Sequence, residues 1–159
     1  ANTRQFANTH EHSGDTTDLI NSYWRTCIID GILVHVTIEV ISDIPGSYAV
    51  GLNDAHLKGG DLYMFIYSIT SRSSFDYVCE CPRRVYEWKE TDSLPMMIVG
   101  NHCDKDKDRQ VLATESRAFA NETGCGSCEV SEHDVSSLDL ALADLVRSKW
   151  AFDKKRRER

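Results

Sequence analysis

The stretch LPMMIVGNHCD, residues Leu94–Asp104, decides the fold because an apolar run ends in a glycine, an amide and a carboxylate. The run up to Val99 predicts a buried strand. Asn101 and Asp104 then follow the carboxyl end of that strand, which is where open α/β sheets bind ligands. Together they can offer an amide and an anionic acceptor to the donor-rich edge of a guanine ring. The pattern N-x-x-D therefore predicts a base-reading loop, with an ordinary helix cap or turn as the alternative.

Two further elements occur in an order that fits such a site. The apolar stretch Val36–Gly46 ends in D-x-x-G. Its Asp43 can hold a magnesium ion through water, and its Gly46 lets a backbone N–H approach a terminal phosphate. The third element, Ser131–His133, follows a short strand-like run at Gly126–Val130. The order and spacing of the three elements predict a nucleotide site more specifically than any one of them does.

At these motifs the chain resembles a Ras-family small GTPase, over residues 22–150. Tyr23–Gly31 resembles the stretch after the family's effector loop, and Tyr67–Phe75 resembles the segment after its central strand. Leu94–Asp104 resembles the guanine motif P-x-x-x-V-G-N-K-C-D, and Ser131–His133 occupies the S-A-K position. The resemblance implies an α/β fold with a doubly wound, mostly parallel sheet flanked by helices.

The resemblance also implies ligands and roles. It implies GTP or GDP with Mg²⁺ as cofactors, and protein effectors or regulators as partners. The residues it places at the nucleotide are Asn101, His102, Asp104, Ser131, Glu132, His133, Asp43 and Gly46. It implies Asp43 as a metal residue, and Thr17 more weakly, because the family's metal-binding threonine aligns with either Thr17 or Asp18. The residues of the effector-like loop expected to contact a partner are Thr16, Thr17, Asp18, Ile20 and Tyr23.

The chain departs from the family pattern at residues that, in the family, bind the nucleotide or take part in its hydrolysis. The 159 residues contain no G-x-x-x-x-G-K-[ST], the loop that cradles phosphates. Ala1–His10 resembles the helix that follows this loop, so we expect the chain to begin just after it and to lack the first, central strand. Ser47 stands where the family has the glutamine that orients the attacking water. His102 and His133 replace two lysines, although an imidazole can still stack on a base.

The expected loss of a central strand leaves two sheet edges to satisfy. These are the inner edges of the predicted strands Leu33–Ile41 and Asp61–Ser68, and buried unpaired backbone groups cost about 1–3 kcal/mol each. Either the two strands pair directly, or another segment or chain fills the gap. We expect direct closure, with hydrogen bonds between the Val36 and Phe65 regions.

Local patterns predict the remaining elements. Asp30-Gly31 predicts a two-residue hairpin between antiparallel strands. Ser71–Glu90 predicts a helix that Pro82 should kink or restart, and Thr114–Asn121 predicts another, closed by Gly124. Five apolar residues of the last helix recur at helical spacing and are expected to face the core. They are Val135, Leu138, Leu142, Leu145 and Val146.

Composition predicts one domain over residues 1–152, followed by a basic tail at 153–159. The chain carries a net charge of −7, and its last six residues hold five basic and one acidic side chain. An acidic body argues against a nucleic-acid partner. The tail could touch an anionic membrane or calmodulin, or its cations could simply favour the helix dipole and fray into solvent. Without a C-a-a-X cysteine we expect no lipid anchor in this chain, and a cytoplasmic location that includes the inner face of a membrane.

The six cysteines and the altered motifs each leave two interpretations. Cys125 and Cys128 form a C-x-x-C, which allows a zinc or disulfide site, but scattered reduced thiols are favoured. For function, the first hypothesis is a guanine-nucleotide switch whose binding and GTP hydrolysis are weakened or lost. The second is a nucleotide-free pseudo-GTPase, an interaction module that would bind a partner around Thr16–Tyr23 and Ser47–Leu57. Rad/Gem-type relatives, with their altered D-x-x-G region, are the analogy for it.

Overall fold

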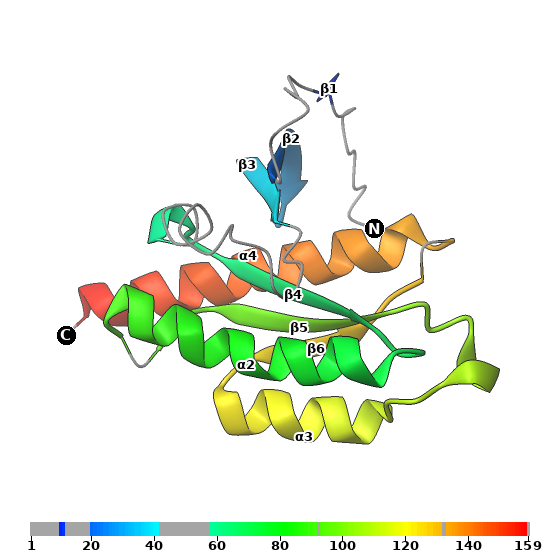
Figure 1. The fold of residues 1–159 in the computed structure, drawn as a ribbon. Coiled ribbons are helices and arrows are strands. Elements are labelled where there is room, and N and C mark those ends of the chain that lie inside the picture. The colour runs from blue at the N-terminus through cyan, green and yellow to red at the C-terminus, as the bar shows by residue number, and fades with distance from the viewer. Residues whose placement is uncertain (1–9, 12–19, 42–57, 92, 132, 159) are drawn as a thin grey trace. The chain divides into compact units, whose positions relative to one another are not determined.

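The structure, a computed structural model, describes residues 10–11, 20–41, 58–91, 93–131 and 133–158 (Figure 1). They belong to two compact units, residues 1–55 and 56–159, which are described separately. The described strands form two three-stranded sheets, one in each unit.

The first unit is an antiparallel sheet in the order β1-β2-β3. Its strands are β1 (His10–Glu11), β2 (Ile20–Ile29) and β3 (Ile32–Ile41). The predicted hairpin is confirmed, because β2 and β3 pair over their whole length and are joined by Asp30 and Gly31. Both turn residues have positive φ, 51° and 82°, as a type I′ turn requires. The helix predicted for the first ten residues lies outside the described residues except at His10, which is a strand residue instead.

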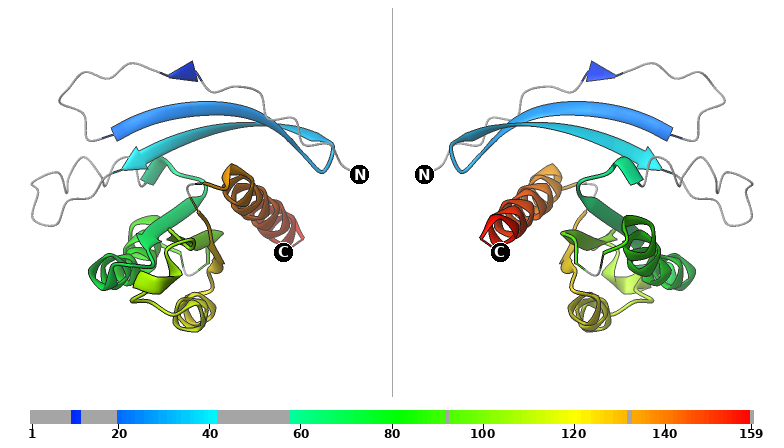
Figure 2. Two further views of the ribbon diagram at one scale, coloured as in Figure 1. Left: turned by 90° about the vertical axis from the view of Figure 1, so that its right-hand side faces the viewer. Right: turned by 90° about the vertical axis from the view of Figure 1, so that its left-hand side faces the viewer.

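The second unit is a parallel sheet in the order β4-β5-β6, flanked by helices on both faces (Figure 1, Figure 2). The elements are β4 (Tyr63–Ser68), α2 (Arg72–Lys89), β5 (Met96–Asn101), a 3₁₀ turn (Asp106–Asp108), α3 (Ala113–Thr123), β6 (Gly126–Glu129) and α4 (Val135–Arg157). Helices α2 and α3 cover one face of the sheet and α4 covers the other. This arrangement confirms the predicted α/β class with a parallel sheet between helices.

Strand β5 forms the centre of this unit because both of its faces are covered. Met96 and Ile98 belong to the core beneath α2 and α3, whereas Met97 and Val99 belong to the core beneath α4. Ile98 and Val99 have no exposed surface. A continuous apolar run is what a strand buried on both faces requires, and it brings Asn101 to the edge of the sheet.

Helix ends follow the capping chemistry of the sequence. Ser71 precedes α2 and accepts a hydrogen bond from the Ser74 N–H. Pro82 is buried inside α2, which continues through it, so the predicted restart does not occur. Helix α3 ends at Gly124 with a φ of 71°, as predicted.

Helix α4 only partly follows its predicted apolar stripe. Leu145 and Val146 are buried, but Leu138 is 42% exposed, so its predicted place in the core is wrong. Helical periodicity identifies a face, but it does not say where along the axis packing begins, and Leu138 lies in the first turn. The basic residues at the end of the chain continue α4 as far as Arg157. Within the described part of the chain, no helix has the length and apolar character needed to cross a bilayer.

The predicted direct closure concerns strands of two different units. β3 is the last strand of the antiparallel sheet and β4 is the first strand of the parallel one. Pairing of the Val36 and Phe65 regions would join the two units, so it stays a prediction.

Candidate functional site

The predicted base loop and the third motif meet at the carboxyl ends of β5 and β6. The Cys103 N–H donates to the Val130 carbonyl over 3.1 Å, and the Val130 N–H donates to the Gly100 carbonyl over 2.8 Å. The Ser131 hydroxyl donates to Asp104 Oδ1 over 2.6 Å. The two motifs are 27 residues apart in sequence, and parallel pairing of β5 with β6 brings them together.

Asp104 is held as an anion. The hydrogen bond from Ser131 is the main cause that lowers the pKa of its carboxyl below the ordinary 3.8, and the charge of His133 lowers it further. His133 Nε2 lies 4.0 Å from Asp104 Oδ2. The carboxylate is therefore an acceptor-only group at neutral pH, which is what the N–H donors of a purine edge need.

Asn101 and His102 are held by contacts with residues at the end of β4 and with each other. The Asn101 carbonyl accepts from the Ile69 N–H over 3.0 Å, and its side-chain Oδ1 accepts from the His102 N–H over 2.8 Å. His102 has a φ of 66°, a left-handed conformation that costs a non-glycine residue about 1 kcal/mol or more. Its Nδ1 lies 2.9 Å from Ser68 Oγ, which itself lies 2.8 Å from Thr70 Oγ1. These contacts hold the imidazole beside the loop.

Arg109 and Glu129, which no sequence pattern indicated, join the loop to β6. Arg109 Nη1 and Nη2 donate to the two Glu129 carboxylate oxygens over 2.6 and 2.9 Å. Hydrogen bonds to Glu129, and then to Asp106, raise the pKa of the Arg109 guanidinium. No local sequence pattern predicts this ion pair, because its two residues lie 20 positions apart in the chain. Ser68, at the end of a strand beside the base loop, could have been found from its position.

The structure places only part of the predicted site. Among the nucleotide residues it brings together Asn101, His102, Asp104, Ser131 and His133. The predicted residues that lie outside the described residues are Asp43, Gly46, Glu132, Thr16, Thr17 and Asp18. Of the predicted partner-binding residues, Ile20 pairs with Ile41 and Tyr23 with Ile38 in the β2–β3 ladder. The phosphate, metal and partner assignments therefore stay predictions.

No disulfide joins the six cysteines, all of which lie in the described part of the chain. Cys125 belongs to the core beneath α2 and α3, whereas Cys128 packs against the core beneath α4. The two thiols of the C-x-x-C pair are thus directed to opposite faces of the sheet. Across the described residues, no group of three His, Cys, Asp or Glu side chains is placed to hold a metal ion.

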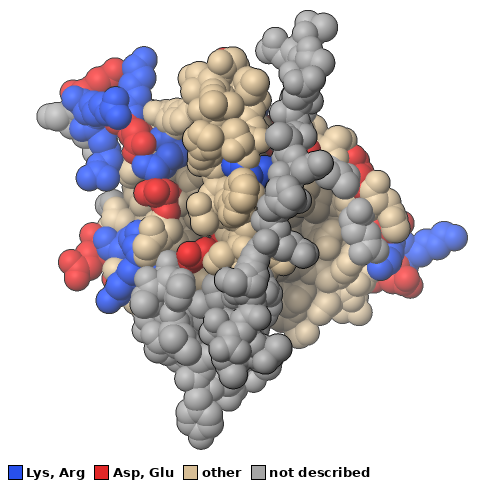
Figure 3. Space-filling model, turned by 90° about the horizontal axis from the view of Figure 1, so that it is seen from above, with Lys and Arg blue, Asp and Glu red and all other residues tan. Residues whose placement is uncertain are grey.

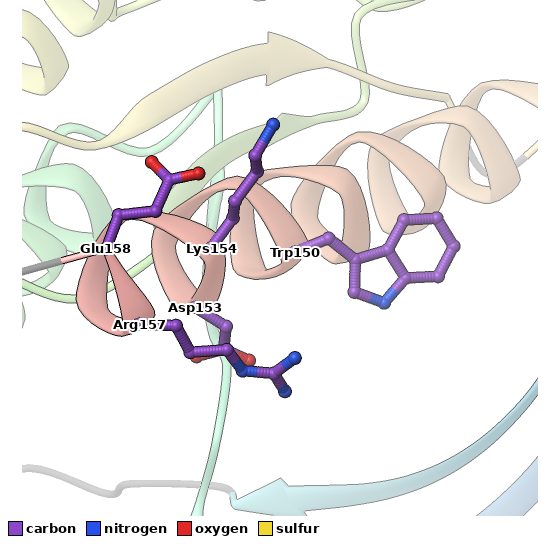
Figure 4. A pocket seen from close by; sticks show the side chains of 5 residues that line it. All are labelled: Trp150, Asp153, Lys154, Arg157 and Glu158. Carbon is purple, nitrogen blue, oxygen red and sulfur yellow. The ribbon is translucent and has the colours of Figure 1, made fainter.

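Neither the surface charge nor the groove found on the surface indicates a site that would replace the base loop. Basic and acidic side chains lie beside each other on the face seen in Figure 3, whereas nucleic-acid binding calls for a broad basic patch. A shallow groove lies on the last turns of α4 (Figure 4). Its described lining residues are Trp150, Asp153, Lys154, Arg157 and Glu158. None of these described lining residues belongs to the base loop.

Comparison with known proteins agrees with this geometry. The sequence profile of the Ras family matches residues 3–150, which begins earlier than the resemblance predicted from residue 22. A Ras-like protein from Laccaria bicolor is 29% identical over 133 residues, which are 84% of this chain and 63% of that protein. The chain therefore spans a little under two thirds of the length of this curated relative.

Proposed function

Since this chain belongs to the Ras family, we propose that the loop Asn101–Asp104, with Ser131, is the base-reading half of a guanine-nucleotide site. The observation that carries this proposal is the 2.6 Å hydrogen bond from the Ser131 hydroxyl to Asp104 Oδ1. It holds the Asp104 carboxylate ionised and fixes one of its oxygens. Because Ser131 lies two residues beyond the end of β6, this hydrogen bond also sets the direction of the second oxygen, Asp104 Oδ2, relative to that strand.

The chemistry of these donors and acceptors selects guanine over adenine. Guanine presents an N1–H and an exocyclic amine on one edge, and a carboxylate can accept from both. Adenine presents an acceptor at N1, which a carboxylate repels. The Asn101 amide can bind a further purine edge atom, and the His102 ring can stack on the base.

The phosphate half of the site sets the expected affinity. Phosphates are gripped by backbone N–H nests and a lysine, and the 159 residues hold no G-x-x-x-x-G-K-[ST]. Hydrolysis further needs a residue that orients the water for in-line attack, and Ser47 is short for that task. A polypeptide of these 159 residues is therefore expected to bind GTP or GDP weakly, with little help from Mg²⁺, and not to hydrolyse GTP.

The second candidate function is a nucleotide-free interaction module within a signalling pathway. The substitutions at Ser47, His102 and His133 favour it, because each alters a position that serves nucleotide chemistry in the family. Its partners would be protein effectors or regulators that bind around Thr16–Tyr23 and Ser47–Leu57. The basic last turns of α4 would allow contact with an anionic membrane in a cytoplasmic protein.

Titration of the polypeptide with guanosine, GDP plus Mg²⁺, and adenosine separates these candidates. If only the base is read, guanosine and GDP bind with similar weak affinity and move the NMR amide signals of the Asn101–Asp104 loop, whereas adenosine does not. Asp104→Ala abolishes the shifts, while Asp76→Ala on α2 serves as the matched control. Micromolar GDP binding would overturn the weak-binding proposal. If neither guanosine nor GDP moves these signals, the nucleotide-free interaction module remains as the candidate function.

A further inference from the structure

The chain segment between β5 and α3 is pinned at both of its ends. At one end, the Ile69 carbonyl accepts from the Gln110 and Val111 N–H groups over 2.8 and 3.1 Å. At the other, the Ile69 N–H donates to the Asn101 carbonyl. These bonds tie residues 101–111 to the end of β4. They leave open how the middle of the segment, which includes Asp104, is held against β6.

Arg109 supplies a further connection to β6, near the end of the segment that precedes α3. Its side chain is only 16% exposed, and it donates to the Asp106 carboxylate over 2.6 Å and to the Val111 carbonyl over 3.0 Å. Its two terminal nitrogens bind both oxygens of Glu129, whose side chain is 23% exposed. A bidentate guanidinium–carboxylate pair fixes direction as well as distance, and partial burial protects it from solvent screening.

The position of Glu129 in the chain links the Arg109–Glu129 ion pair to the base loop. Glu129 ends β6, opposite Gly100 of β5, and is followed directly by Val130 and Ser131. Each of these three consecutive residues holds a different point of the segment: Glu129 holds Arg109, Val130 holds Cys103, and Ser131 holds Asp104. A shift between the segment and β6 would therefore lengthen the Ser131–Asp104 hydrogen bond.

We propose that Arg109 is a positioning residue for base recognition: through Glu129 it sets the distance between the 101–111 segment and β6, and thereby the orientation of the Asp104 carboxylate. The recognition part of this inference rests on the proposed function. The positioning part rests on the contacts alone. Lysine cannot replace Arg109, because a single ammonium has no fork to bind both Glu129 oxygens while also reaching Asp106.

Amide hydrogen exchange tests the positioning part whether or not nucleotide binds. The variants are Arg109→Lys and Glu129→Gln, with Arg83→Lys as the matched control. Arg83 also pairs with a glutamate, Glu87, but on the exposed surface of α2 with the two side chains 77% and 59% exposed. We expect exchange at Cys103 and its neighbours to quicken about tenfold in both test variants, with α2 unchanged. The control leaves both regions unchanged.

Ligand preference tests the recognition part. Inosine lacks the exocyclic amine of guanosine. The ratio of guanosine to inosine affinity therefore reports how well the Asp104 carboxylate is oriented to accept a hydrogen bond from that amine. In both test variants this ratio falls toward one, whereas general destabilisation would weaken both ligands equally. Unchanged loop exchange in Arg109→Lys, or exchange that quickens equally in α2, would overturn the positioning role. If the unmodified chain binds neither nucleoside, the proposed function fails while the exchange result still decides the role of Arg109.

Discussion

The Tyr67 hydroxyl occupies the space beside Gly100 that a β-carbon would need. A β-carbon at Gly100 would lie 2.8 Å from Tyr67 Oη and 3.1 Å from Ile69 Cγ2. Tyr67 and Ile69 are buried, at 2% and 0% exposure, so neither can move into solvent. The residue immediately before Asn101 must therefore be a glycine, which has no β-carbon.

Gly100→Ala should destabilise the second unit by about 1–3 kcal/mol, because overpacking forces buried side chains from their preferred positions. Urea unfolding followed by helical circular dichroism measures this, since the helices α2, α3 and α4 all belong to residues 56–159. Gly59→Ala is the control, because a β-carbon there meets nothing within 4 Å.

Removing the Tyr67 hydroxyl should rescue part of that loss. In a Tyr67→Phe background the 2.8 Å contact with Oη disappears, while the 3.1 Å contact with the ring carbon Cζ remains. Gly100→Ala should therefore cost less in that background, and a double-mutant cycle measures the difference. Equal costs in both backgrounds would show that the hydroxyl does not limit the space.

The parts of this architecture that were predicted from sequence are those with local causes. The run up to Val99 is apolar because both faces of β5 are covered, and Asp30-Gly31 suits a turn with two positive φ values. Asn101 and Asp104 were predicted as site residues because the loop follows a strand. Arg109 was missed because a charged residue in a loop rich in Lys and Asp looks solvated, and only tertiary packing brings it to β6.

The pKa of Asp104 should depend on the Ser131 hydroxyl. That hydrogen bond is the main cause lowering the carboxyl pKa below 3.8. A lowered folded-state pKa means that this contribution to stability is present above pH 3.8 and is lost as the pH falls through the lowered value. In Ser131→Ala the Asp104 titration midpoint should move up toward 3.8, as followed by its carboxyl-carbon NMR signal.

Asp134 provides the internal control for that titration. Its pKa is also lowered, but by hydrogen bonds from Ser136 and Ser137 at the start of α4. Its midpoint should not change in Ser131→Ala. An unmoved Asp104 midpoint in the same spectra would contradict the role assigned to Ser131.

Cys128 should resist alkylation while the chain is folded. Burial, followed by the charges of Asp144 and Glu129, raises the pKa of its thiol to about 11. At pH 8 only about one thiol in a thousand is then ionised, and the thiolate is the form that reacts. Mass spectrometry after brief iodoacetamide treatment should find Cys128 unmodified in buffer and modified in urea. Rapid labelling in buffer at pH 8 would show that the site is open.

The β2–β3 hairpin should depend on the backbone freedom of Gly31 rather than on packing. Gly31 has a φ of 82°, and a β-carbon there meets nothing within 4 Å, so Gly31→Ala adds no clash. A left-handed conformation nevertheless costs an alanine about 1 kcal/mol more than a glycine. Amides of the β2–β3 ladder should therefore exchange about fivefold faster in Gly31→Ala. Gly59→Ala, which has equal space and no positive φ, should leave these amides unchanged, and equal effects of the two variants would contradict the type I′ turn.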